Sequence, residues 1–153
     1  MNAPVIKGNP LKITVGLLVA SYVLGEFFFP KYPTFYFLKI IGIMGLLISI
    51  IFFYSGFNLF KLYKENPVPT SSTERLIKTG IFAYSRNPIY VSFVMFHLNM
   101  FLVFENVMYF LSFIGLSIWI HNYVIKEEEK FLLNQFPEEY QRYKYAVKRW
   151  LFF

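Results

Sequence analysis

The sequence predicts an all-α integral membrane protein with about four transmembrane helices and a C-terminal amphipathic helical segment. Hydrophobic residues make up 56% of its 153 residues and aromatic residues 22%, which is more apolar surface than a soluble fold of this size can bury. Three runs without a charged residue, 40–60, 87–104 and 106–125, contain 21, 18 and 20 residues. About 20 apolar residues of helix cross a bilayer, so each run is long enough to span one or nearly so.

The chain is expected to form a single domain with four spans. The expected spans are residues 11–29, 36–60, 88–104 and 106–125, with a polar connection at 61–87 and a charged tail at 126–153. The first span ends at Pro30 without the small-residue cleavage site of a secretory signal, so we interpret it as a retained span. Little more than Glu105 separates the third span from the fourth, which predicts a tight antiparallel hairpin.

The basic residues predict the orientation. Lys31, between the first two spans, and Lys39, near the start of the second, belong to one side of the membrane. The other thirteen of the fifteen Lys and Arg residues belong to the opposite side, because they lie at or before the start of the first span, in the connection or in the tail. Basic residues accumulate on the cytoplasmic side, so both termini are expected there. The membrane is expected to be the inner membrane if the protein is bacterial and that of the endoplasmic reticulum if it is eukaryotic.

The composition also excludes several kinds of site. The chain has no Cys, no Asp and only two His, so no metal site is expected. His97 and His121 are interpreted as hydrogen-bonded residues of the helical bundle. The net charge is +6, and the basic residues responsible for it flank hydrophobic segments. This arrangement favours a membrane surface over nucleic acid as the partner.

The connection holds a possible short helix before the third span. Ser71 and Glu74 have the spacing of a capping box, and Gly80 is placed to end the helix in the left-handed conformation. Arg75 is expected to lie apart from any site, since it is further from the span than Arg86 is.

Arg86 and Asn87 are expected at the membrane surface, beside the positive end of a helix. Pro88 suits the first turn of the third span. Backbone N–H groups, a guanidinium and a helix dipole together can hold a carboxylate or a phosphate.

Three consecutive acids, Glu127, Glu128 and Glu129, extend the fourth span out of the membrane. Successive residues of a helix point about 100° apart, so at least one of the three is expected to face the bundle. The alternative is a solvated run of charges that pairs with Lys126 and Lys130.

The tail has helical periodicity. Apolar residues on one face are Leu132, Phe136, Tyr140, Tyr143, Val147 and Trp150. Pro137 is expected at the first position of a second helix. Such a segment either lies at the membrane interface or also closes over a site, and the pattern supports both equally.

Together these segments resemble the small integral-membrane methyltransferases, which include isoprenylcysteine carboxyl methyltransferase and the phospholipid N-methyltransferases. The resemblance covers residues 76–150, about half of the chain. It consists of Gly80-x5-Arg86-Asn87-Pro88-x-Tyr90 and, after the hairpin, Glu128-Glu129-x-x-Leu132-x3-Phe136-x3-Tyr140-x-x-Tyr143 and Arg149-Trp150.

The resemblance implies methyl transfer from S-adenosylmethionine to a lipid-like or isoprenoid-bearing acceptor at the cytoplasmic membrane face. It implies cofactor binding by Gly80, Tyr84, Asn87, Pro88, Tyr90, Glu128, Glu129, Phe136 and Tyr140, and catalytic roles for Arg86 and Glu129. Arg86 could orient a carboxylate acceptor, and Glu129 or Glu128 could take the proton of an amine. Asn87 stands where carboxyl methyltransferases usually have His, so the acceptor stays open.

Two other functions are compatible with the sequence. Membrane reductases of the steroid-reductase type use a nicotinamide cofactor and share an Arg-x-Pro-x-Tyr-like segment, although the short chain and the Glu-Glu segment argue against that class. A non-enzymatic membrane subunit could also have kept the scaffold.

Overall fold

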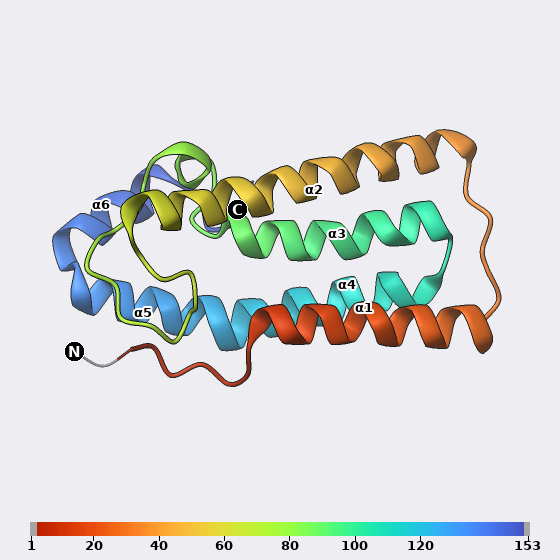
Figure 1. Ribbon diagram of the computed structural model, residues 1–153, viewed down its shortest axis with the longest axis horizontal. Coiled ribbons are helices and arrows are strands. Elements are labelled where there is room, and N and C mark those ends of the chain that lie inside the picture. Colours follow the sequence, from red (N-terminus) through yellow and green to blue (C-terminus); the bar gives the residue numbers. More distant parts are fainter. Residues whose placement is uncertain (1–2, 152–153) are drawn as a thin grey trace.

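Four apolar helices lie side by side in an elongated bundle in the computed structural model, which describes residues 3–151 (Figure 1). Residues 1–2 and the last two of the expected tail, 152–153, lie outside the described range. The bundle helices are α1 (Pro10–Phe27), α2 (Tyr36–Tyr63), α3 (Pro88–Phe104) and α4 (Val107–Trp119). Every regular element within residues 3–151 is helical, as the sequence predicts.

The fourth apolar helix continues as one rod far beyond the length of a membrane span. After α4, a π-helical turn (Ile120–Ile125) leads directly into α5 (Lys126–Gln135). The rod Val107–Gln135 has 29 residues. That length corresponds to about 44 Å, against about 30 Å of hydrocarbon. The length beyond one span comes from α5, in which residues 126–130 are all charged.

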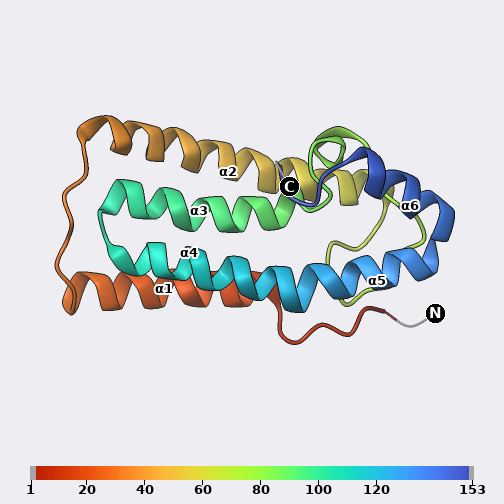
Figure 2. The ribbon, with the colours of Figure 1, turned by 180° about the vertical axis from the view of Figure 1, so that it is seen from behind.

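The chain is an integral membrane protein. α1, α2 and the rod Val107–Gln135 are long and apolar enough to cross a bilayer. α3 is a shorter apolar helix of 17 residues. It lies between α2 and α4 in both views (Figures 1 and 2). Large apolar side chains of α2, such as Met44 and Leu47, are more than half exposed, as expected of a face that meets lipid.

Small residues allow the helices to approach closely. A Cβ atom at Gly42 of α2 would meet the Leu102 side chain of α3 at 2.9 Å, and one at Gly45 would overlap the side chain of Asn99. Close approach at glycine is a common way for helices to associate in membranes, where dispersion contacts replace the hydrophobic effect.

The two ends of the bundle differ. Figure 2 shows α5, α6 (Pro137–Ala146) and the connection after α2 gathered at one end. At the other end, Glu105 adopts a left-handed conformation (φ 58°) and makes the predicted tight turn between α3 and α4. Its carboxylate accepts a hydrogen bond from the Thr34 N–H at 2.6 Å and pairs with Lys39 at 3.1 Å. Glu105 thereby ties the α1–α2 connection to the hairpin.

The expected capping-box helix in the connection does not form. The Ser71 hydroxyl donates to the carbonyls of Asn66 and Val68 in a local turn, and the Glu74 N–H donates to the carboxylate of Glu65. Both groups of the predicted box therefore have other partners. Gly80 has the expected positive φ of 57°, but it begins a short 3₁₀ helix, η1 (Gly80–Ala83), rather than ending a helix.

Proline begins helices where the sequence predicts, but the tail is helical for a shorter distance than its periodicity suggests. Pro88 starts α3 and Pro137 starts α6. Val147 is extended (φ −125°, ψ 136°), so it and Trp150 are not part of the helical face. After Ala146, the backbone carbonyls of Lys148 and Arg149 instead accept hydrogen bonds from the segment before α3.

Candidate active site

A cavity of about 140 Å³ lies at the end of the bundle where α5, α6 and the connection meet. The expected site residues that line it are Arg86, Asn87, Pro88, Tyr90, Glu128, Glu129 and Tyr140. They come from the start of α3, from α5 and from α6, so the fold brings together the two segments of the sequence resemblance. Sequence reasoning missed the walls that the connection and Tyr143 contribute.

Three expected residues do not line this cavity. Gly80 and Tyr84 lie at a shallow surface with Leu59 of α2, and the Tyr84 side chain is 71% exposed. Phe136 is at the bend between α5 and α6. Conversely, Arg75 was expected to lie apart from the site, yet it lines the cavity.

Arg86 is almost completely enclosed, with a side chain only 6% exposed. Its Nη2 donates to Glu129 Oε1 at 2.9 Å, and its Nη1 donates to the backbone carbonyl of Lys144 at 3.2 Å. Its buried Nε–H has no hydrogen-bond partner among residues 3–151. Buried donors are rarely left unpaired, so this N–H favours an acceptor beside it, either a water molecule or a ligand atom.

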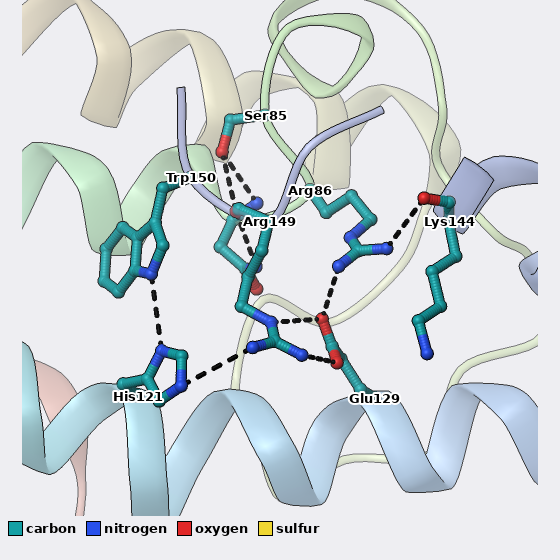
Figure 3. A network of polar contacts seen from close by, with 8 residues as sticks. Ser85, Arg86, His121, Glu129, Lys144, Arg149 and Trp150 are labelled. Atoms are coloured by element: carbon teal, nitrogen blue, oxygen red, sulfur yellow. Dashed lines mark hydrogen bonds and ion pairs between the residues drawn. The ribbon is translucent and has the colours of Figure 1, made fainter. Parts of the chain in front are cut away.

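Glu129 binds a second guanidinium, that of Arg149 (Figure 3). Arg149 Nε donates to Oε1 at 2.9 Å and Nη2 donates to Oε2 at 2.6 Å, a bidentate arrangement. The hydrogen bonds to Glu129 raise the pKa of Arg149. Arg149 was not among the expected site residues, although it is part of the motif that carries the resemblance.

Glu128 is the carboxyl group of the cavity that remains available to a ligand. The Tyr90 hydroxyl donates to its Oε1 at 2.8 Å. Burial raises the pKa of Glu128 to about 8; the nearby charge of Glu129 adds to this shift, and the hydrogen bond from Tyr90 opposes it. Glu128 is therefore largely protonated at neutral pH.

The three consecutive glutamates face different surroundings, as helical geometry predicts. Glu127 pairs with Lys130 at 2.6 Å on the exposed side of α5. The interpretation as a solvated charge run thus holds for Glu127 alone.

The tail closes over this end of the bundle. The Arg86 N–H donates to the Lys148 carbonyl at 2.9 Å, and the Ser85 hydroxyl and the Asn87 side-chain amide donate to the Arg149 carbonyl at 3.2 and 2.9 Å. Of the two interpretations of the tail, closure over a site is the one that these contacts support.

Two tyrosines of α6 form an aromatic wall. Tyr140 and Tyr143 are buried and line the cavity, and their ring centroids lie 6.2 Å apart. Burial raises the pKa of both phenols, so they stay neutral. The Tyr143 hydroxyl donates to the Phe82 carbonyl at 2.6 Å, which fixes α6 against η1.

The two histidines lie outside the cavity lining. His97 is buried in α3, and its Nδ1 lies 2.9 Å from the Phe93 carbonyl oxygen. His121 lies against the tail, with its ring stacked on Trp150 at 6.5 Å between centroids. Within residues 3–151, no group of three or more His, Cys, Asp or Glu residues is placed to hold a metal ion.

A comparison with protein families agrees with this geometry. The model of the phospholipid methyltransferase family matches residues 37–139, which is more than half of the chain and includes Arg86, Glu128 and Glu129. The chain belongs to the phospholipid methyltransferase family. No curated protein matches the chain, and neither does any solved structure. Family membership confirms the resemblance found in the sequence and places the chain among membrane methyltransferases.

Proposed function

We propose that the protein transfers a methyl group from S-adenosylmethionine to an amphiphilic acceptor at the cytoplasmic face of the membrane. The observation that carries this proposal is that Arg86, Tyr90 and Glu128 line one and the same cavity. It lies at the end of the bundle beyond Ile125, where a lipid's head could enter while its tail stays in the bilayer.

The residues of the cavity suit the groups of this cofactor. The unpaired Arg86 Nε–H can donate to a carboxylate, and the Glu128 carboxyl can bind the hydroxyls of a ribose. The faces of neutral Tyr140 and Tyr143 can stabilise a cation, as a sulfonium requires. The cofactor supplies a methyl group bound to positively charged sulfur, so the protein's task is chiefly to position the reactants and exclude water.

The acceptor is a lipid-like or isoprenoid-bearing molecule with a carboxylate or an amine as its reactive group. A carboxylate needs no base, and Arg86 would orient it. An amine must lose a proton before transfer, and Glu128 would take it in its ionised form, which predominates above pH 8. Glu129 already accepts three N–H hydrogen bonds from Arg86 and Arg149, so it cannot accept a proton without breaking an ion pair. Its part in the reaction is to hold Arg86.

Incubation of the purified protein in lipid nanodiscs with methyl-labelled S-adenosylmethionine and lipid extracts tests the proposal. We expect the label to appear in a lipid or lipidated fraction, which mass spectrometry would identify. Oxidation of a nicotinamide cofactor without methyl transfer would favour the reductase. Failure to bind either cofactor, together with co-purification of a partner, would favour the non-enzymatic subunit.

A further inference from the structure

Arg149 is connected to Arg86 through a shared carboxylate, that of Glu129. Its guanidinium binds both oxygens of Glu129, and Glu129 in turn binds Arg86. The Glu129 and Arg86 side chains are 12% and 6% exposed, so water screens this chain of contacts little. The three groups lie in the order Arg149, Glu129, Arg86, and only Arg86 and Glu129 line the cavity.

We propose that Arg149 is a positioning residue for methyl transfer. The inference rests on the proposed function and deepens it. Arg149 fixes the Glu129 carboxylate, and that carboxylate fixes Arg86 with its Nε–H free for a ligand. Arg149 itself touches neither the cofactor nor the acceptor.

The charges of the cluster identify the ligand group that it would hold. Arg86 and Arg149 carry two positive charges and Glu129 carries one negative charge. In the ligand-free protein Glu128 does not correct this imbalance at neutral pH, because its pKa is raised to about 8. A buried excess charge is costly until it is paired, so the cluster favours an oxyanion beside Arg86. Such a group can come from the carboxylate of the cofactor or from a carboxylate or phosphate of the acceptor.

The side chain of Arg149 can be tested separately from the docking of the tail. The hydrogen bonds that dock the tail go to the carbonyls of Lys148 and Arg149, which any residue at these positions retains. His121 lies behind the guanidinium, with Nε2 at 3.5 Å from Nη1 of Arg149. The guanidinium is thus confined between His121 and Glu129 (Figure 3).

Arg149→Gln and Arg149→Lys, assayed in nanodiscs, test the role of this side chain. We expect Arg149→Gln to lower kcat/KM at least about tenfold in a protein that stays folded, since a charged hydrogen-bonded contact is lost. Arg142→Gln is the matched control, because Arg142 is exposed on α6. It should retain the wild-type rate within about twofold, as surface substitutions usually do.

Direct titration with S-adenosylmethionine identifies the source of the oxyanion. Weaker binding of the cofactor to Arg149→Gln would assign the Arg86 contact to the cofactor. Unchanged cofactor binding with a raised KM for the acceptor would assign that contact to the acceptor. Either result supports the positioning role.

A double-mutant cycle separates positioning from a purely structural role. If Arg149 acts through Glu129 on Arg86, then Arg86→Lys should cost about tenfold in the wild type but less than about threefold in the Arg149→Gln background. A structural role predicts the same cost of Arg86→Lys in both backgrounds, and that result would overturn the proposal.

The remaining outcomes are also decisive. If Arg149→Gln fails to fold, Arg149→Lys takes its place, because an ammonium cannot reproduce the two parallel N–H···O bonds that a guanidinium forms with a carboxylate. Wild-type kcat/KM in a folded Arg149→Lys protein would then overturn the positioning role. Full activity of Arg149→Gln would overturn the inference alone, whereas a wild-type protein without methyl transfer would overturn the proposed function as well.

Discussion

Arg86 and Arg149 donate to the same oxygen atom, Oε1 of Glu129, each from 2.9 Å. One residue precedes the third span and the other lies in the tail, so a single carboxylate joins two segments that are far apart in the sequence. Removing one member of such a buried cluster leaves its partners uncompensated, which usually costs more than the pair contributes. This relationship makes the charged residues of the cavity the most informative targets for mutagenesis.

Arg86→Lys is expected to lower methyl transfer about tenfold or more while leaving membrane insertion intact. The Lys ammonium keeps the positive charge at the membrane surface but cannot reproduce the fork of donors that reaches Glu129, the Lys144 carbonyl and a ligand. The measurement is kcat/KM with labelled cofactor. Arg142→Lys serves as the control, because Arg142 is exposed on α6. Arg75 is unsuitable as a control, because it lines the cavity. Normal turnover by Arg86→Lys would remove Arg86 from the site.

The three glutamates of α5 are expected to differ sharply when each is changed to Gln. Glu127→Gln should resemble the wild type, because Glu127 pairs with Lys130 at the surface and such pairs contribute little. Glu128→Gln should weaken cofactor binding about tenfold, through a lost charge-assisted contact. Glu129→Gln should lower both activity and thermal stability, since two guanidiniums lose their counter-ion. Small, equal effects at all three positions would contradict this assignment.

Cofactor binding is expected to depend on pH through Glu128. Its pKa is raised to about 8, so the carboxyl is neutral below that value and ionised above it. A cationic sulfonium binds the ionised form better. Binding below pH 8 must therefore release a proton, and the affinity should rise by up to about tenfold per pH unit between pH 6 and 8. Calorimetric titrations across this range check the slope, and Glu128→Gln should make it flat.

The same group gives the free protein a pH-dependent stability of defined sign. A carboxyl whose pKa rises from the ordinary 4.5 to about 8 on folding contributes stability that is complete below pH 4.5 and is lost as the pH increases through 8. Thermal unfolding of the ligand-free protein should therefore occur at lower temperature at pH 8 than at pH 6. This difference should shrink in Glu128→Gln, and an undiminished difference would assign it to another group.

Packing of α1 on α4 can be tested with two glycines of one helix. A Cβ atom at Gly25 would overlap the Asn106 side chain, which is held in place by hydrogen bonds with Ser21 and Met108. Gly25→Ala should therefore destabilise the protein by about 1–3 kcal/mol, the usual cost of overpacking. Gly16 has open space around its Cα, so Gly16→Ala should be neutral or stabilising. Equal thermal stabilities of the two variants would show that α1 packs differently.

Topology is expected to follow the basic residues. Reporter fusions after residues 34, 65 and 105 and at the C-terminus should report outside, inside, outside and inside, in that order. This arrangement places the cavity at the cytoplasmic face. A C-terminus on the periplasmic or lumenal side would contradict the orientation and the proposed access of the acceptor.

Local patterns predicted most of the fold. The long apolar runs indicated the bundle helices, because a bilayer fixes the length of its spans. Pro88 and Pro137 marked helix starts correctly, since the missing N–H of proline is no loss at the first position of a helix. The turn at Glu105 followed from the shortness of the link between two spans.

Contacts between distant segments account for the rest of the site. The Ser71 hydroxyl donates to a nearby carbonyl instead of capping a helix. The spacing of a capping box does not show whether such competing acceptors are present. The segment after Ala146 leaves the helix because its backbone pairs with the turn at Arg86. Arg149 was recognisable as part of a motif, but its bond to Glu129 depends on how the tail folds back. Gly80 and Tyr84 lie in the same segment as Arg86, yet η1 directs them to another surface.

The π-helical turn Ile120–Ile125 determines the directions in which the side chains of α5 point around the axis of the rod. Such a turn accommodates one residue more than a regular α-helical turn, and one residue corresponds to a rotation of about 100°. Without it, α5 would emerge rotated by that angle, and a different member of the Glu127–Glu129 run would meet the cavity. A short stretch of irregular backbone between α4 and α5 thus selects, among three chemically identical neighbours, the carboxyls that face the cavity.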